Sequence, residues 1–375
     1  MKRHFNYPLL FLIIFLAGFS LLFFSILSTP ASMQRFGNPN YYFYHQLLFG
    51  FLPAIIMGIV AYKISLPFLK KWAFWLVLFN LLFSFSVFLP FLGSKLGGAT
   101  RWINLGFFSV QPSEFLKVSA ILYLSAWIAA RLPEGNVSGW KSSAKRGYHN
   151  LIYIFFPFVV FLGIITVALF FQRDASTLGI ISLTLLALYF YARTPIWHTL
   201  VIIFSGLGFL SLIIRFEPYR LDRWFILLNP DHDPLGKGYQ LKQSLISLGS
   251  GGFFGKGLGM SVQKFNFLPT AMSDSIFAII GEELGIVGGV SLIVLFVLIF
   301  WAGIKISKKS TDRFSSLVAF GIVTWITLQA FVNIASSAGI FPLAGIPLPF
   351  FSYGGSHLVV EMIGVGLLLN ISKNS

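Results

Sequence analysis

A few charged residues stand next to long apolar segments or inside them, and these are the candidates for chemistry. Asp274 lies in FLPTAMSDSIF, directly before an apolar run. A carboxylate in that position could act as a general base on a hydroxyl group. It could equally cap the N-terminus of the helix that follows. The sequence leaves both roles open.

A second group surrounds QPSEFLK. Glu114 and Lys117 are three residues apart, so they share one face of a helix, and Pro112 is suited to begin that helix. They form a structural ion pair, or they form a polar cavity wall in which Lys117 binds an anion. Arg101 precedes them in GGATRW at the edge of the segment. Charges inside membrane segments are costly, which favours a paired or functional role.

Arginines and glycines gather in a long polar stretch. Arg220 and Arg223 lie three apart in PYRLDRW, and guanidinium groups bind phosphate oxygens in a bidentate manner. Alternatively, they are ordinary basic loop residues beside anionic headgroups. The glycine-rich GSGGFFGKGLG lacks the GxxxxGK[ST] pattern and does not indicate a nucleotide site.

Two further motifs place carboxylates in apolar segments. Glu282 and Glu283 in IIGEELG lie about 9 Å along the helix after Ile276. We expect one of the two to face the bundle and pair with a cation. Glu361 follows His357 by four residues, and we expect it to make a satisfied interhelical contact.

The segment FPLAGIPLPFFSYGGSHL, residues 341–358, predicts irregular backbone at membrane depth. Such backbone is tolerated only where protein buries it or where it lines a cavity. Ser352, Tyr353 and the amides of Gly354 and Gly355 could donate to an anionic or sugar ligand. The alternative is a simple turn before the last helix.

The amino-acid composition indicates that the segments around these motifs lie in a membrane. Hydrophobic residues make up 56% of the 375 and charged residues 10%, so most of the chain lies in lipid. The absence of cysteine excludes disulfides and thiolate sites, and the six histidines lack an HExxH pattern. The net charge of +15 does not indicate nucleic acid, because the basic residues fall at the ends of apolar runs.

Ten apolar segments are long enough to span a bilayer. They cover residues 8–27, 46–64, 73–93, 112–130, 151–171, 175–192, 197–214, 276–303, 314–337 and 352–371. The first is too long for a signal peptide and is interpreted as a retained anchor. We therefore predict an all-α polytopic membrane protein of ten transmembrane helices, forming one domain over residues 1–375.

The distribution of lysine and arginine predicts orientation. It places both termini in the cytoplasm and the long loop between helices 7 and 8, at about 216–275, outside. An amphipathic stretch around Tyr239–Leu248 predicts a partly helical cap on the outer membrane surface.

Together these motifs resemble the SEDS family (shape, elongation, division and sporulation). GATRWINLG with QPSEFLK, then NPDHDPLGKGYQLKQSLISLGSGGFFGKGLGMSVQK, then SDSIFAIIGEELG and LPFFSYGGSHL follow the family order over essentially the whole chain. YQLKQSL and GLGMSVQK are more similar to the FtsW branch than to the RodA branch. The chain departs from the usual family residues at Arg173, Thr270, Met272, Ser273 and Ser275.

The resemblance implies a peptidoglycan glycosyltransferase in cell division. It would polymerise lipid II at the outer face of the bacterial cytoplasmic membrane, with a class B penicillin-binding transpeptidase as partner. Asp274 matches the essential loop aspartate of the family and is the expected general base. The expected substrate-binding residues are Arg101, Glu114, Lys117, Arg220, Arg223, Gln243, Ser244, Lys264, Glu283, Ser352, Gly354 and Gly355. A divalent cation, Mg or Mn, could assist at the substrate pyrophosphate, but no dedicated ligand cluster is readable.

Three alternatives remain. A RodA-like elongation polymerase would use the same motifs, and a lipid II flippase would use the same cations. A flippase should concentrate charge at the midplane of a two-sided path, whereas the candidates here gather near the outer side. A scaffold that recruits division proteins explains neither a buried Lys117 nor the long loop.

Overall fold

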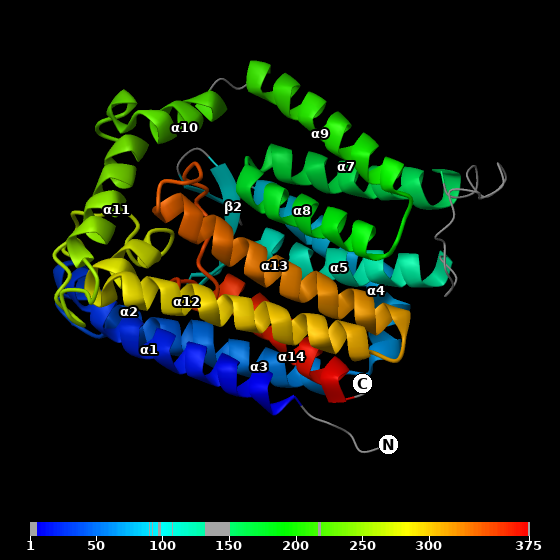
Figure 1. Cartoon of the computed structure of the whole chain (residues 1–375), viewed down its shortest axis with the longest axis horizontal. Coiled ribbons are helices and arrows are strands. Elements are labelled where there is room, and N and C mark those ends of the chain that lie inside the picture. Colours follow the sequence, from blue (N-terminus) through cyan, green and yellow to red (C-terminus); the bar gives the residue numbers. More distant parts are fainter. Residues whose placement is uncertain are drawn as a thin grey trace.

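The computed structural model describes residues 6–89, 91, 93–96, 99–106, 108–131, 151–216 and 219–373. Over this part the chain is a bundle of long helices with one small sheet, and a helical cap covers one end (Figure 1). The helices are α1 (Tyr7–Phe36), α2 (Tyr41–Gln46), α3 (Leu52–Lys63), α4 (Leu66–Phe85), α5 (Pro112–Arg131), α7 (Phe156–Phe171), α8 (Ala175–Tyr191), α9 (Ile196–Phe216), α10 (Tyr219–Leu228), α11 (Lys237–Gly251), α12 (Ile276–Lys309), α13 (Arg313–Ser337) and α14 (Gly355–Lys373).

The prediction of an all-α polytopic membrane protein is confirmed. Eight helical segments in the described residues are long and apolar enough to cross a membrane: Tyr7–Phe36, Tyr41–Lys63, Leu66–Phe88, Pro112–Arg131, Leu151–Phe171, Ile276–Lys309, Arg313–Ser337 and Gly355–Lys373. The two other expected spans coincide with the shorter apolar helices α8 and α9. The total of ten therefore stays a prediction.

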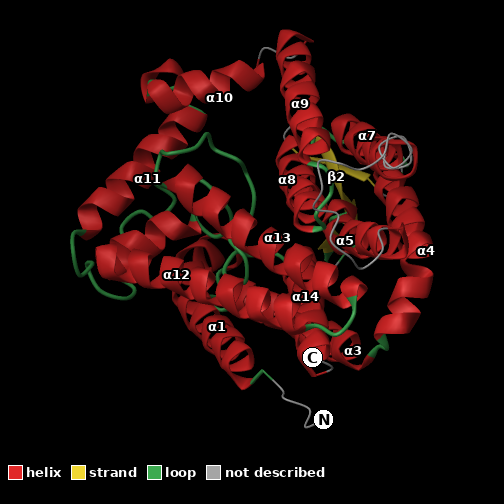
Figure 2. Ribbon diagram, turned by 45° about the vertical axis from the view of Figure 1, so that its right-hand side comes forward, coloured by secondary structure: helices red, strands yellow, loops and turns green. Residues whose placement is uncertain are grey.

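Three helices form the centre of the bundle. The apolar windows of α5, α13 and α14 are 67%, 72% and 78% buried, against 28–33% for the other spans. In Figure 2 these helices lie among the others. They contain Glu114, Lys117 and Glu361, and these three charged side chains are buried in protein and do not face lipid, where a charge is costly.

A three-stranded antiparallel sheet stands where the sequence indicated only a connection. Its strands are β1 (Gly93–Leu96), β2 (Ala99–Asn104) and β3 (Ser109–Val110), in the order β1-β2-β3. Ile103 of β2 lies opposite both Gly93 and Val110. The strands are too short for an alternating pattern to be recognised. The sheet matters because β2 holds Arg101.

The cap consists of α10, α11 and the chain that joins α11 to α12. It lies at the end of the bundle opposite the first residue of α1 and the last residue of α14 (Figure 1). The predicted amphipathic stretch lies within α11. The side of the membrane that the cap faces stays a prediction.

The helix α12 is broken near the cap. Gly285 has φ 67° and ψ −165°, a conformation that favours glycine and interrupts the helical hydrogen bonds. Residues 252–257 replace those bonds. Four backbone hydrogen bonds of 3.0–3.2 Å join the two segments, from Lys256 to Glu282, Gly257 to Glu283, Ile286 to Gly252 and Val287 to Phe253.

Candidate active site

The backbone around Asp274 is fixed on three successive residues. The Asp274 carbonyl accepts a hydrogen bond from Asn333 Nδ2 at 2.8 Å. The Ser273 carbonyl accepts one from Ser352 Oγ at 2.5 Å, and the Met272 carbonyl accepts one from the Tyr353 amide at 2.8 Å. All three contacts use main-chain atoms of the segment, and none of them involves the Asp274 carboxylate.

The helix cap considered for Asp274 is wrong. The N-cap of α12 is Ser275, and its side chain makes no capping hydrogen bond. Asp274 therefore stands one residue outside the position from which a side chain accepts the N2 or N3 amide.

The Asp274 carboxylate is partly buried and has no ion-pair partner among the residues that the structure describes. A β-carbon on Gly345 would stand 3.6 Å from its Oδ2, so the loop after α13 lies against it. Burial raises the pKa of Asp274 above its ordinary value, and the Ser273 hydroxyl and the positive charges of Arg101 and His357 partly oppose this shift. The result is a carboxylate that is more basic than one on an open surface.

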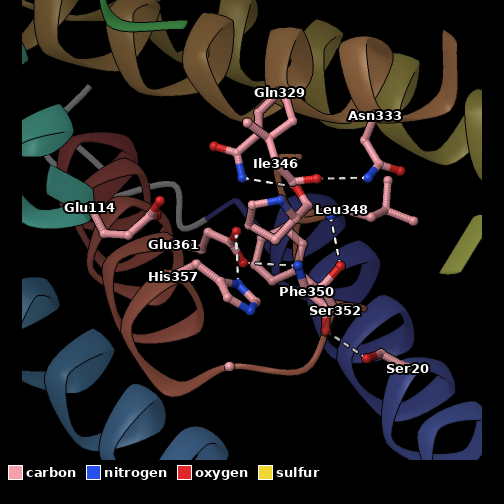
Figure 3. A network of polar contacts seen from close by, with 12 residues as sticks. Ser20, Glu114, Gln329, Asn333, Ile346, Leu348, Phe350, Ser352, His357 and Glu361 are labelled. Atoms are coloured by element: carbon pink, nitrogen blue, oxygen red, sulfur yellow. Dashed lines mark hydrogen bonds and ion pairs between the residues drawn. The ribbon is translucent and has the colours of Figure 1, made fainter. Parts of the chain in front are cut away.

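The irregular backbone predicted for residues 341–358 is confirmed up to α14, and it is buried in protein. Figure 3 shows four of the side chains that hold it. Ser20 donates a hydrogen bond to the Phe350 carbonyl, and the Phe350 amide donates one to Glu361. Gln329 donates to the Pro347 carbonyl and Asn333 donates to the Ile346 carbonyl. The four bonds are 2.6–3.1 Å long. Asn333 thus binds this loop and Asp274 with one amide group.

The contact of Glu361 differs from the expected interhelical one. Its carboxylate lies 3.3 Å from His357 Nδ1 on the same helix and accepts the Phe350 amide at 2.8 Å (Figure 3). The loop folds back over the start of α14, so its backbone, and not another helix, meets the carboxylate.

Glu114 and Lys117 form the expected ion pair, with Nζ and Oε2 2.8 Å apart and both side chains 3% exposed. Lys117 also donates to Gln329 Oε1 at 2.8 Å and lies 5.4 Å from the ring centroid of Trp325. Because Gln329 holds Pro347, the pair is linked to the loop beside Asp274. Contact between Lys117 and a substrate stays a prediction.

Two of the predicted arginines reach the same region. Arg101 lies 3.7 Å from Asp174, donates to the Arg173 carbonyl through Nη2, and has no hydrogen-bond partner for Nε among the described residues. Arg223 Nη1 donates to the Leu343 carbonyl at 3.3 Å. The side chain of Arg220 lies outside the described part of the structure.

Lys237, at the start of α11, was missed by sequence reasoning. Burial lowers its pKa to about 8, and the charges of Arg223 and Arg101 contribute, while Asp233 opposes the shift. Lys237 therefore belongs to the same positive region. A single lysine in a glycine-containing loop gives no spacing pattern from which this could be inferred.

A cavity opens beside these cations, with about 850 Å³ of empty space including its mouth. Its lining includes Arg173, Ser176, Arg223 and Trp224, and also Ala344 and Ile346, which flank Gly345. The loop that lies against Asp274 therefore also forms one wall of this cavity.

The two adjacent glutamates of α12 both pair with cations, which corrects the expectation that only one would. Glu282 lies 2.7 Å from Lys256, and Glu283 lies 3.2 Å from Lys264. Both glutamates are 1% exposed. Neighbouring carboxylates can both be satisfied here because residues 256–264 wrap around the helix and meet each from a different side.

The remaining predicted residues are placed as follows. Ser244 on α11 is buried and its Oγ has no partner among the described residues, while Gln243 beside it is partly buried. Ser352 Oγ accepts the Leu348 amide at 2.8 Å. The Gly354 amide donates to Gln46 at 3.0 Å. Gly355 begins α14 with its backbone against the Phe49 carbonyl.

The described residues contain no group of three or more histidine, aspartate or glutamate side chains that could hold a metal ion.

Comparison with known proteins begins with the family model of FtsW, RodA and SpoVE, described as "Cell cycle protein", which matches residues 7–375. The "Probable peptidoglycan glycosyltransferase FtsW" of Coxiella burnetii is 36% identical over 95% of this chain and 93% of that protein. The protein of the same name in Borreliella burgdorferi is 37% identical over 97% and 96%. The "Stage V sporulation protein E" of Bacillus subtilis is 36% identical over 91% and 89%.

Solved structures share the fold. A chain from a peptidoglycan synthase complex, studied for its coordination of polymerization and crosslinking, superposes with a TM-score of 0.78 at 22% identity, covering 98% of this chain and 97% of that one. The rod shape determining protein RodA of Thermus thermophilus gives a TM-score of 0.67 at 21% identity, over 98% and 96%.

Proposed function

Because the chain belongs to the SEDS family of FtsW, RodA and SpoVE, and within it is most like FtsW, we propose that Asp274 is the general base of its glycosyl transfer. The protein is a multi-pass membrane protein and a peptidoglycan glycosyltransferase.

The substrate is lipid II, whose disaccharide is linked to a lipid through pyrophosphate. The Asp274 carboxylate removes a proton from a sugar hydroxyl, and the hydroxyl oxygen forms a bond to the anomeric carbon of the other sugar. The bond from that carbon to the pyrophosphate breaks, and its electron pair leaves with the lipid pyrophosphate. One displacement inverts the anomeric centre, so an α-linked donor gives a β-linked glycan.

The observation that supports this role is that the backbone of Asp274 is held in place while its carboxylate has no ion-pair partner among the described residues. Its carbonyl and the two preceding carbonyls are held by Asn333, Ser352 and Tyr353, so the position of the residue is fixed. Its carboxylate has no ion pair among the described residues, and burial raises its pKa. A general base requires a fixed position and an oxygen that is free to accept a proton.

Positive charges that gather near Asp274 are suited to the leaving pyrophosphate. Arg101 and Arg223 offer guanidinium groups, and Lys237 adds a third cation whose charge Arg223 and Arg101 repel. Binding an anion relieves that repulsion and stabilises the charge that develops as the bond breaks. We include Arg220 in this set on its motif alone.

Lys117 has a supporting part in this proposal. It is bound to Glu114 and Gln329, and Gln329 holds the loop that lies against Asp274. A pyrophosphate that entered the cavity and reached Lys117 would compete with Glu114 for the ammonium group. A divalent cation, Mg or Mn, would be held mainly by the pyrophosphate and would supply further positive charge there.

The chain is proposed to lie in the bacterial cytoplasmic membrane with both termini in the cytoplasm and the cap outside, where lipid II is polymerised. Its partner is proposed to be a class B penicillin-binding transpeptidase. This is in keeping with a fold shared with a chain of a peptidoglycan synthase complex.

The test uses the purified full-length protein with its transpeptidase and labelled lipid II in detergent, with glycan strands separated on a gel. We expect a ladder of polymer. Detergent removes the two sides of a membrane, so a flippase would give no product in this assay. An absence of polymer from folded, partner-bound protein would contradict the proposal.

A further inference from the structure

Residues 252–267, which join α11 to the segment before Asp274, have an apolar outer surface. Seven of their large apolar side chains are exposed: Phe253, Phe254, Leu258, Met260, Val262, Phe265 and Phe267. Phe254 exposes 78% of its surface and Met260 exposes 66%. So many exposed apolar side chains on one loop, beside only a few exposed polar ones such as Lys256 and Asn266, indicate contact with lipid or with another protein.

Irregular backbone in lipid requires that protein groups satisfy its polar atoms, and a large part of this backbone is satisfied in that way. The acceptors are the two glutamates of α12, Glu282 and Glu283. Their carbonyl and carboxylate oxygens accept hydrogen bonds of 2.8–3.3 Å from the amides of Lys256, Gly257, Gly259, Ser261 and Val262. A loop in water would need no such set of buried acceptors.

The depth of residues 252–267 in the membrane can be estimated from the part of α12 that they contact. The Val287 amide donates to the Phe253 carbonyl, so these residues lie at one level. Trp301, with Lys305 3.1 Å from its ring centroid, is typical of the opposite membrane interface. A hydrocarbon core of about 30 Å covers about 20 helical residues and so extends from Trp301 to about residue 281. Phe253 then lies about six residues, or roughly 9 Å, inside the core.

The apolar surface of these residues is continuous with surfaces that face lipid. Ile286 and Val290 on α12 are 56% and 51% exposed and follow directly after the level of Phe253. On the other side, the backbone of Gly259 packs against Ile26 of α1. Figure 1 shows this part of the chain, in yellow-green, at the cap ends of α12 and α1.

We propose that residues 252–267 form a membrane-inserted loop whose apolar side chains contact the acyl chains of the bilayer leaflet on the cap side. The loop anchors the cap to the membrane at the base of the segment that holds Asp274. The inference rests on burial, backbone pairing and depth, and it is independent of the reaction and of which side the cap faces.

The chain has no cysteine, so single cysteines provide unique labelling sites. Phe254→Cys and Met260→Cys, each in the full-length protein, are given a nitroxide label and placed in vesicles of phosphatidylethanolamine and phosphatidylglycerol. Collision rates with oxygen, which concentrates in hydrocarbon, and with a water-soluble nickel chelate are then measured. Val290→Cys is the lipid control, and Asp231→Cys, whose side chain is 70% exposed in the cap, is the water control.

We expect the ratio of oxygen to nickel accessibility at Phe254 and Met260 to match that at Val290 within about twofold. It should exceed the ratio at Asp231 by about fivefold or more, because oxygen is apolar and partitions into hydrocarbon. A ratio like that at Asp231 would mean that the loop lies in water and would overturn the proposal. Shielding from both reagents would mean that a second protein copy covers the loop, and it would overturn the proposal as well.

Discussion

Asp274 and the Glu282–Glu283 pair lie within ten residues of one another, yet their surroundings are opposite. The two glutamates are 1% exposed, and each has a lysine partner. The Glu283 carboxylate also accepts two amide hydrogen bonds, and the Glu282 carboxylate accepts one amide and two hydroxyl hydrogen bonds. The backbone of Asp274 is held by Asn333, and its carboxylate, beside the Ser273 hydroxyl, has no ion pair in the described part of the chain. All three residues carry a carboxylate, so residue type alone does not distinguish them. They differ in how many hydrogen-bond and ion-pair partners already occupy the carboxylate oxygens.

A saturated carboxylate cannot easily accept a proton, because its lone pairs are already used and nearby cations favour its charged form. A partly buried carboxylate whose oxygens lack an ion-pair partner can accept a proton more easily. We therefore propose a structural role for Glu282 and Glu283 and a catalytic role for Asp274, and each role can be tested by removing one group.

The largest effect is expected for Asp274→Asn. The amide is nearly the same size but cannot accept a proton at neutral pH, so the rate of polymerisation should fall by about 10² to 10⁴. The backbone contacts of residue 274 are unchanged, so the melting temperature should match that of the parent. Glycan yield and melting temperature are measured on the same preparation. A near-parental rate would move the base to another residue.

Glu283→Ala should act mainly on stability. It leaves the Lys264 ammonium, only 6% exposed, without its partner, and breaking a buried pair costs about 3–5 kcal/mol. Thermal unfolding in detergent measures the loss. The double variant Glu283→Met with Lys264→Met is the matched control and should recover much of it.

The expectation for Glu283 would be contradicted if Glu283→Ala had the melting temperature of the parent but made no polymer. It would place Glu283 in substrate binding, where its family motif suggested it, and would remove the distinction from Asp274.

The Glu114–Lys117 pair should separate folding from activity. Replacing both, with Glu114→Leu and Lys117→Met, removes an ion pair that is 3% exposed and leaves no single buried charge, so the protein should fold. We expect polymer to be lost, because Lys117 also binds Gln329, which holds the loop beside Asp274. Polymer yield and melting temperature are compared with those of the parent. Full activity would return the pair to a structural role.

The smallest effect concerns pH. The pKa of Lys237 is lowered to about 8, so its charge is lost as pH rises through that value, and the rate of the parent should then decline by a few fold. Lys237→Arg keeps its charge and should remain active at higher pH. The matched control is Lys242→Arg on the same helix, which should decline like the parent. An unchanged alkaline decline in Lys237→Arg would exclude Lys237 from the site.

Much of the fold followed from the sequence because hydropathy over about 20 residues is a strong signal. The start of α5 at Pro112 and the position of α11 were also predicted. The sheet was missed because strands of two to six residues carry no readable period. The break at Gly285 was missed because a glycine in an apolar run has several ordinary explanations.

The site was predicted in part. Asp274 emerged from its position and from the resemblance, and the Glu114–Lys117 spacing correctly indicated a pair. The partners of the Glu282 and Glu283 carboxylates come from a loop some twenty residues earlier that folds back over them. A contact between such distant residues leaves no local sequence pattern from which it could be predicted. Lys237 joins the cations only because α11 packs beside Arg223.

The network that holds the loop after α13 determines when this protein becomes competent during its synthesis. Its members come from α1, α13 and α14, and the bond from Ser20 to Phe350 joins residues 330 positions apart. A chain that enters the membrane from its N-terminus completes α1 early and α14 last. Glu361 and Ser352 are therefore absent while Asp274 is already translated. We infer that the ribosome must finish almost the whole chain before the carboxylate is positioned, so nascent or C-terminally shortened chains are inert.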